Sequence, residues 1–262
     1  MCVVPVISAN MLTANVLLIV FFFSGQFPGA LACLVWSNLF LTVPQKMEAL
    51  GGSCLQIPCY FWARYKNDFD DSKTFGVWIK RERNFDQNPV VFNSSGSVNT
   101  YPMKMIGNLN QKNCTTLFSH LNTTYSGQYL FRVEKWPFKE TALCDRLQLT
   151  VTNFPPSPRI EISGDLKENQ SVTVTCSALT PCPRWPPKLT WNLQKDSHNH
   201  MEQNTDGNFT TKIQESITLS EQHDGYNISC SAAYPVNEGE EEKTAEETKT
   251  LSVSCQITSV SC

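Results

Sequence analysis

The chain has 262 residues, of which 41% are hydrophobic and 17% are charged, and its formal net charge at pH 7 is -3. This length predicts about two domains. The small negative charge gives no electrostatic reason to expect nucleic acid as a partner. Eleven cysteines, without the paired C-x-x-C spacing of zinc or redox sites, indicate an oxidising, secretory compartment.

The N-terminus has the features of a signal peptide. Residues 16–25, VLLIVFFFSG, form an apolar run that is too short to cross a bilayer. The small residues of ALA at 30–32 follow at a cleavage position, so we expect residues 1–32 to be a signal peptide. No Lys or Arg precedes the run, and Met11 is an alternative start to Met1. A buried element of the mature fold is the alternative interpretation.

Sequons of the form N-x-S/T predict N-glycosylation. With a signal peptide and many cysteines, they indicate an extracellular or cell-surface protein of the secretory pathway. No later apolar run reaches the roughly 18 residues of a membrane span, so none is expected within this chain. One sequon differs from the others, because its middle residue is Cys114, a candidate for a disulfide. The sequons begin at Asn93, Asn113, Asn122, Asn169, Asn208 and Asn227.

Residues 35–152 read as short strands separated by turns. Trp78 has the position of the core tryptophan in strand C of an immunoglobulin sandwich, and Tyr129 that of the tyrosine corner in strand F. The spacing from Cys59 to Tyr129 leaves room for the additional C′ strands of a variable-type domain. The predicted strands B to G are SCLQIPCYF, FGVWIK, YPMKMIG, CTTLFSHL, YLFRVE and DRLQLTVT.

A second domain is expected at residues 153–254, after the proline-rich connector NFPPSPRIEI. Cys176, Trp191 and Cys230 follow one another in the order of the immunoglobulin signature. The acidic run EGEEEKTAEE at 238–247 is interpreted as a solvated turn between strands F and G, and residues 255–262 as a C-terminal tail. The sequence thus predicts an all-β protein of two tandem immunoglobulin-like β-sandwiches, variable-type and then constant-like.

Strand F of the first domain departs from this signature, because Phe131 occupies the usual cysteine position. Cys54 and Cys59 differ by 59 − 54 = 5, an odd number, so they point to opposite faces of strand B. Cys114, at the start of strand E, is a candidate partner for Cys59 within one sheet, with Phe131 filling the space between sheets. The second domain has two signature cysteines for its own bridge. Cys54 and Cys182 then remain as candidates for a link between domains.

The stretches GSCLQIPC, GNLNQKNCTTLFSHL, SGQYLFRVE and CSALTPC together resemble the first two domains of the sialic-acid-binding immunoglobulin-like lectins, the Siglecs. The resemblance covers about residues 44–254. It implies the disulfides Cys54–Cys182, Cys59–Cys114 and Cys176–Cys230, of which the first joins the two domains.

Arg132 is expected to point outward, because its neighbour in the strand faces the core. Outside this family pattern, a surface ion pair with Glu134 would be the simpler interpretation. The resemblance implies instead that Arg132 holds the carboxylate of sialic acid. A guanidinium suits that role, since it offers two parallel hydrogen bonds and stays charged. Strand G would contact the rest of the sugar, with Thr141 and Leu143 as further ligand-binding candidates.

The apolar half of the implied site departs from the family pattern. The expected aromatic residues fall on Leu39 in strand A and near Leu143 in strand G. We choose Trp36 as the substitute on strand A. Tyr125 replaces the usual aspartate, so its salt bridge is not expected, and Cys144 has no family partner. Other nearby aromatics, which either contact the ligand or pack in loops, are Phe40, Trp136 and Phe138.

The expected function is that of a lectin in cell adhesion and immune recognition. Its partners would be sialylated glycoproteins or gangliosides, and no cofactor, bound metal or enzymatic activity is expected. No nucleophile–base pair or metal-ligand spacing is present, and His198 and His200 are interpreted as solvated. The alternative is an immunoglobulin adhesion or receptor fragment with a protein ligand and no sialic acid binding. The linkage preference, and whether the chain is a secreted form, a fragment or a truncated sequence, stay open.

Overall fold

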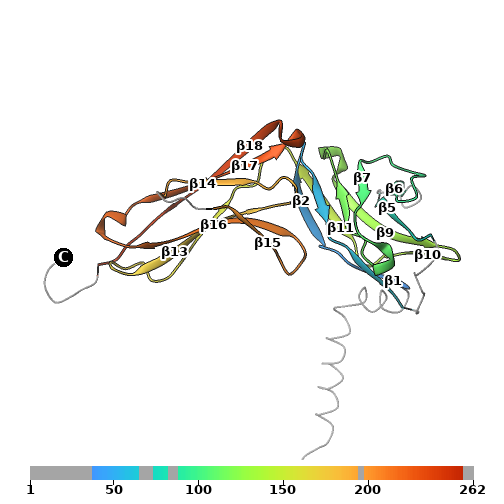
Figure 1. Cartoon of the computed structure of the whole chain (residues 1–262), viewed down its shortest axis with the longest axis horizontal. Helices are drawn as coiled ribbons and strands as arrows, with labels where there is room; N and C mark the ends of the chain where they lie inside the picture. The colour runs from blue at the N-terminus through green and yellow to red at the C-terminus, as the bar shows by residue number, and fades with distance from the viewer. Residues whose placement is uncertain (1–36, 65–72, 82–87, 194–197, 256–262) are drawn as a thin grey trace, which may run out of the picture.

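The computed structural model describes residues 37–64, 73–81, 88–193 and 198–255, which form two β-sandwiches placed end to end (Figure 1). The predicted signal peptide, Trp36 and residues 256–262 of the predicted tail lie outside the described residues.

The first sandwich has two layers of strands. Its strand β6 (Val90–Asn93) lies beside β5 (Phe75–Arg81), and this is the kind of additional strand that a variable-type domain has. One layer runs in the order β2 (Lys46–Leu50), β11 (Leu147–Thr152), β9 (Gly127–Lys135), β5 (Phe75–Arg81) and β6 (Val90–Asn93), and β10 (Phe138–Thr141) also pairs with β9. The other layer contains β1 (Leu39–Thr42) paired with β4 (Tyr60–Ala63), and β3 (Leu55–Ile57), β8 (Thr116–Phe118) and β7 (Met103–Met105).

Two strands predicted as continuous are divided. Predicted strand B consists of β3 and β4, with Pro58 between them, and a proline has no backbone N–H to continue a ladder. Predicted strand G, DRLQLTVT, corresponds to β11, whereas Thr141, which was expected on the same strand, is the last residue of β10, and residues 142–146 separate the two. β10 pairs with the second half of β9, where Thr141 lies opposite Arg132. β11 pairs with the first residues of β9, 127–129, and runs parallel to β2. The division therefore places the end of β10 beside the arginine.

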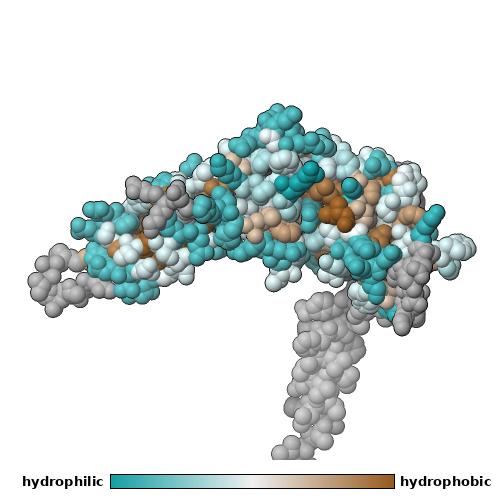
Figure 2. Space-filling model, in the orientation of Figure 1, coloured by the Kyte–Doolittle hydropathy of each residue, from teal (hydrophilic) through white to brown (hydrophobic). Residues whose placement is uncertain are grey.

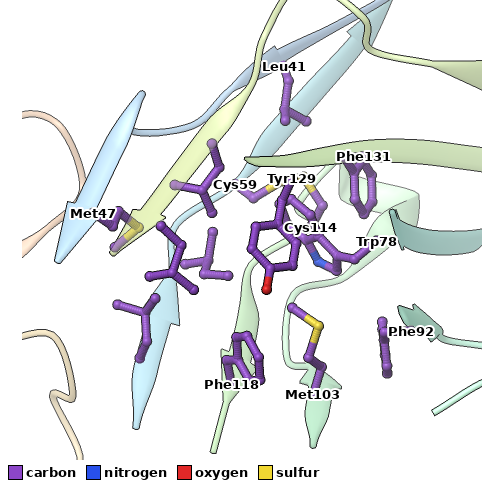
Figure 3. Packing of buried hydrophobic residues seen from close by; sticks show 14 of the residues in the cluster. Leu41, Met47, Cys59, Trp78, Phe92, Met103, Cys114, Phe118, Tyr129 and Phe131 are labelled. Atoms are coloured by element: carbon purple, nitrogen blue, oxygen red, sulfur yellow. A yellow bond between two sulfur atoms is a disulfide. The ribbon is translucent and has the colours of Figure 1, made fainter. Parts of the chain in front are cut away.

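Phe131 fills the centre of the first sandwich and is fully buried. Its ring lies 5.1 Å from that of Trp78 on β5 and 6.3 Å from that of Phe61 on β4, so it contacts both layers (Figure 3). The disulfide Cys59–Cys114 lies within one layer, because Cys114 N also donates to Cys59 O at 2.8 Å. An aromatic ring thus occupies the space where an immunoglobulin domain usually has an intersheet bridge.

The tyrosine corner is formed by Tyr129, whose hydroxyl donates to the carbonyl oxygen of Tyr125. Tyr125, which stands in place of the usual aspartate, lies 4.4 Å from the Tyr101 ring and 5.1 Å from the Phe118 ring. This aromatic cluster packs the base of strand β9, and so it helps to fix the strand that carries Arg132.

The second sandwich has the layer arrangement of a constant-type immunoglobulin domain. Cys176 on β13 (Ser171–Leu179) and Cys230 on β17 (Asn227–Val236) join its two layers by a disulfide, and Trp191 pairs with Cys230. The predicted all-β fold, variable-type and then constant-like, is therefore confirmed. The layers are β12 (Arg159–Ser163), β13 (Ser171–Leu179), β16 (Phe209–Thr218) and β15 (His200–Gln203) on one side, and β14 (Lys188–Trp191), β17 (Asn227–Val236) and β18 (Glu241–Thr250) on the other.

The acidic run at 238–247 is not only a turn. From Glu241 onward it forms strand β18, so its interpretation as a turn is wrong for most of the run. Lys243 Nζ lies 3.4 Å from the carbonyl oxygen of Gly51, and Glu238 Oε1 lies 3.4 Å from His120 Nε2. The run therefore contacts the first sandwich.

The two sandwiches are joined covalently by the disulfide Cys54–Cys182. Next to it, Gln56 N donates to Pro181 O at 2.8 Å, and Leu50 packs into the core of the second sandwich. Figure 2 shows a largely hydrophilic surface with an apolar patch beside this junction. Throughout the part of the chain that the structure describes, no helix has the length and hydropathy needed to cross a membrane.

Candidate functional site

Arg132 lies on β9, between its cross-strand partners Val77 on β5 and Thr141 on β10. Because Phe131 points into the core, Arg132 points to the outer face of the sheet, where 27% of its side chain is exposed. Val77, Ile79 and Leu130 form a buried apolar cluster on the same sheet. Two apolar strands therefore hold the backbone of the arginine in place.

Thr141 orients the guanidinium. Arg132 Nε donates to Thr141 Oγ1 at 3.0 Å, and the two residues are direct cross-strand neighbours on one face. A guanidinium is planar, so holding Nε fixes the direction of the edge that carries Nη1 and Nη2. With Nε engaged by Thr141, Nη1 and Nη2 are the nitrogens left to make two parallel hydrogen bonds to a carboxylate.

Two further charges lie beside the arginine. Glu134 Oε1 is 3.5 Å from Arg132 Nη1 and 3.2 Å from Lys139 Nζ, so one carboxylate is shared by two cations. The ion pair weighed in the sequence analysis is therefore present. Lys139 was not predicted, although it lies opposite Glu134 once the hairpin turns at residues 136–137. The three side chains together carry one net positive charge, which suits an anionic ligand.

Strand β1 and the residue before it are tied to β10 and to the segment that follows β10. Asn38 Nδ2 donates to Glu140 Oε1 at 3.2 Å, and Leu41 N donates to Asp145 Oδ2 at 2.8 Å. Leu39, where the family pattern places an aromatic residue, is fully buried and belongs to the core. Strand A thus reaches the neighbourhood of Arg132 without a described aromatic contact to it.

The aromatic and apolar candidates divide into core and surface residues. Phe138 packs against the core of the first sandwich, and Phe40 stacks on Trp62 at 4.0 Å. Trp136, in the turn between β9 and β10, is 93% exposed. Leu143, in the segment between β10 and β11, is 58% exposed. Only Trp136 and Leu143, of these four, offer apolar surface near the end of the hairpin.

The segment between β10 and β11 is held by a disulfide at Cys144 and by a hydrogen bond from Arg146. Cys144, for which the resemblance gives no partner, takes part in a disulfide, and Cys255 in the C-terminal part of the described chain does so as well. Arg146 Nε donates to the carbonyl oxygen of Leu143 at 3.1 Å. Burial, and then repulsion from Arg81, lowers the pKa of the Arg146 guanidinium below its ordinary value. Arg146, in the segment between β10 and β11, and Arg81 at the end of β5 are thus neighbouring cations.

All six sequon asparagines lie at exposed or half-buried positions. In three of them, Asn93, Asn113 and Asn122, the side-chain Oδ1 accepts a hydrogen bond from the backbone N–H two residues later, at 2.9–3.0 Å. Their amide nitrogens are accordingly turned away from the backbone. Asn169, Asn208 and Asn227 lie before β13, before β16 and at the start of β17.

No family model matches the chain. Rat myelin-associated glycoprotein is 24% identical over 204 residues, which cover 74% of this chain and 32% of that protein. Human sialic acid-binding Ig-like lectin 12 is 29% identical over 161 residues, 59% of this chain and 27% of that protein. Human sialic acid-binding Ig-like lectin 9 is 26% identical over 162 residues, 59% of this chain and 35% of that protein. The matched region thus spans about a third of the length of these relatives.

A solved structure, the ectodomain of mouse nectin-like molecule 4, matches 80% of this chain and 67% of that chain, with a TM-score of 0.34 and 14% sequence identity. The class of protein follows from the strand order itself. Two sandwiches with these layers and core residues define a protein of the immunoglobulin superfamily. Within it, the chain is a distant homologue of myelin-associated glycoprotein and the Siglecs, as the sequence resemblance predicted. This group consists of binding proteins and not enzymes.

Proposed function

We propose that the first sandwich is a lectin domain that binds the terminal sialic acid of sialylated glycoproteins or gangliosides. The observation that carries the proposal is the outward position of Arg132 on β9, with Nε held by Thr141. Relatives that are named for sialic acid binding support it. The disulfide-bonded immunoglobulin domains fit a protein of the secretory pathway or the cell exterior.

In this proposal the ligand carboxylate takes the place of Glu134 beside Arg132. Glu134 already has a second cation, Lys139, at 3.2 Å, so it keeps an ion pair when the arginine turns to the ligand. Hydrogen bonds to charged groups contribute about 1.5–3 kcal/mol each. A single sugar in a shallow, exposed site is expected to bind with a Kd of about 1 mM, or ~4 kcal/mol. The carboxylate contact would then supply most of the affinity.

The remainder of the sugar is proposed to lie along the end of β10 and the segment after it. Thr141 would lie next to the bound sugar, because it already contacts the guanidinium, and Leu143 would offer exposed apolar surface to the sugar. Trp136 is the exposed aromatic ring on the same hairpin.

The test uses clustered sialosides, because multivalency makes weak sites measurable. The purified chain should bind sialylated beads, and sialidase treatment of the beads should abolish the binding. Arg132→Ala should also abolish it. Arg132→Lys keeps the charge without the two-pronged geometry and should bind at least about tenfold more weakly than wild type.

The matched control is Arg159→Ala. Arg159 and Glu161 form an exposed pair at 2.9 Å with the same i, i+2 spacing on strand β12 of the second sandwich. This variant should bind like wild type. Full binding by a folded Arg132→Ala would show that the arginine is not the sialic acid contact.

One observation favours the second candidate function, an immunoglobulin adhesion or receptor protein with a protein ligand. The ion pair between Arg132 and Glu134 is the arrangement expected of a surface arginine that binds no ligand. Absence of sialidase-sensitive binding on a glycan array would favour this function.

A further inference from the structure

Strand β4 exposes two large aromatic rings side by side. Tyr60 is 53% exposed and Trp62 is 47% exposed, whereas Phe61 between them is buried in the core. Alternate residues of a strand share a face, so both rings stand on the outer face of this layer. Trp62 is held rigid because it stacks on Phe40 with ring centroids 4.0 Å apart and an interplanar angle of 12°. Together the two rings offer a rigid, exposed aromatic surface on which a sugar ring can pack.

A sequon asparagine lies directly against this surface. Tyr60 and Asn113 form an isolated antiparallel bridge, and Asn113 Nδ2 lies 3.4 Å from the Tyr60 hydroxyl oxygen. Asn113 Oδ1 accepts a hydrogen bond from Thr115 N at 2.9 Å, which turns Nδ2 toward the tyrosine. The adjacent disulfide Cys59–Cys114 fixes this juxtaposition, because it links the residues next to Tyr60 and Asn113.

We propose that Asn113 carries an N-glycan whose first N-acetylglucosamine packs on the Tyr60 ring, with Trp62 extending the surface under the next part of the glycan. Nδ2 attacks the anomeric carbon of a lipid-diphosphate-linked oligosaccharide donor, the bond from that carbon to the diphosphate oxygen breaks, and Nδ2 loses one proton. The second amide N–H remains and can still donate to the tyrosine hydroxyl. The weakly positive C–H groups on one face of the sugar then meet the negative face of the aromatic ring.

The location is compatible with the proposed lectin site without depending on it. β4 belongs to the layer opposite the one that carries Arg132, so a glycan on Tyr60 leaves the outer face of β9 and β10 uncovered. The glycan would also shield the two exposed rings from contact with other molecules.

The test is a double-mutant cycle on protein secreted from mammalian cells: wild type, Asn113→Gln, Tyr60→Ala and the double variant. Peptide mass spectrometry after enzymatic deglycosylation in ¹⁸O water should show Asn113 to be occupied. Asn113→Gln should lower the Tm of the wild type by about 3–8 °C, the order of shift that a single lost contact gives in a domain of this size. In the Tyr60→Ala background the same change should lower the Tm by less than half as much.

Two controls separate the ring from other effects. Tyr60→Phe keeps the ring without the hydroxyl, so the shift caused by Asn113→Gln should be retained. Asn122 makes the same turn but caps a short helix outside the strand pairing, so Asn122→Gln should show no coupling to Tyr60→Ala. An unoccupied Asn113, or equal shifts with and without the Tyr60 ring, would overturn the proposal.

Discussion

The alternation of Phe131 and Arg132 gives the strongest quantitative prediction, because it decides which way the arginine points. Phe131 is fully buried and its ring contacts aromatic rings from both layers, whereas Arg132 stands on the outer face. Removing a buried phenylalanine side chain costs the lost transfer free energy and leaves a cavity, typically ~3–5 kcal/mol. Phe131→Ala should therefore lower the unfolding free energy by about that amount. Arg132→Ala loses a partly exposed ion pair and should cost less than ~1 kcal/mol.

Both variants would be measured by thermal and denaturant unfolding with circular dichroism. For a domain of this size, ~3–5 kcal/mol corresponds to a fall in Tm of at least about 12 °C. Phe131→Leu is the conservative control and should lie between wild type and Phe131→Ala. Equal and small losses at both positions would refute the assignment of strand faces, and with it the outward position of Arg132.

Three further predictions concern the charges, the junction and the second sandwich. Lys139→Ala leaves Arg132 as the only cation paired with Glu134, so binding to sialylated beads should fall about two- to fivefold. Glu134→Gln in the same background should restore the binding. A loss that persists would mean that Lys139 does not act by pairing with Glu134. Replacing Cys54 and Cys182 by serine should leave both sandwiches folded but make the connector at 153–158 more sensitive to limited proteolysis; an unchanged cleavage rate would show that the noncovalent contacts suffice. The Tyr234 hydroxyl is buried without a hydrogen-bond partner among the described residues, and burial raises its pKa. Tyr234→Phe should therefore keep the unfolding free energy at pH 7 or raise it by up to ~1 kcal/mol. Above pH ~10 only the unfolded state releases the Tyr234 proton, so the wild type should lose stability there more steeply than the variant, and parallel curves would contradict this.

The sequence by itself determined the features that depend on neighbouring residues in one strand. Side chains alternate between the faces of a strand with a period of two, so Phe131 inward implies Arg132 outward. The tyrosine corner and the order of cysteine and tryptophan follow from spacing along the chain in the same way. These features predicted the sandwich class and the outward arginine, and four longer stretches of the sequence indicated the resemblance to the Siglecs.

Only the tertiary structure decided which side chains of different strands meet. The pairing of β10 with β9 sets Thr141 opposite Arg132 and Lys139 opposite Glu134, and that register depends on where the hairpin turns. Of the two hairpin aromatics, Phe138 packs against the core and Trp136 stays exposed, which no local pattern distinguishes. The contact of Asn113 with Tyr60 joins residues 53 positions apart. Such contacts follow from strand pairing and core packing together, and both are properties of the folded chain and not of any short stretch of it.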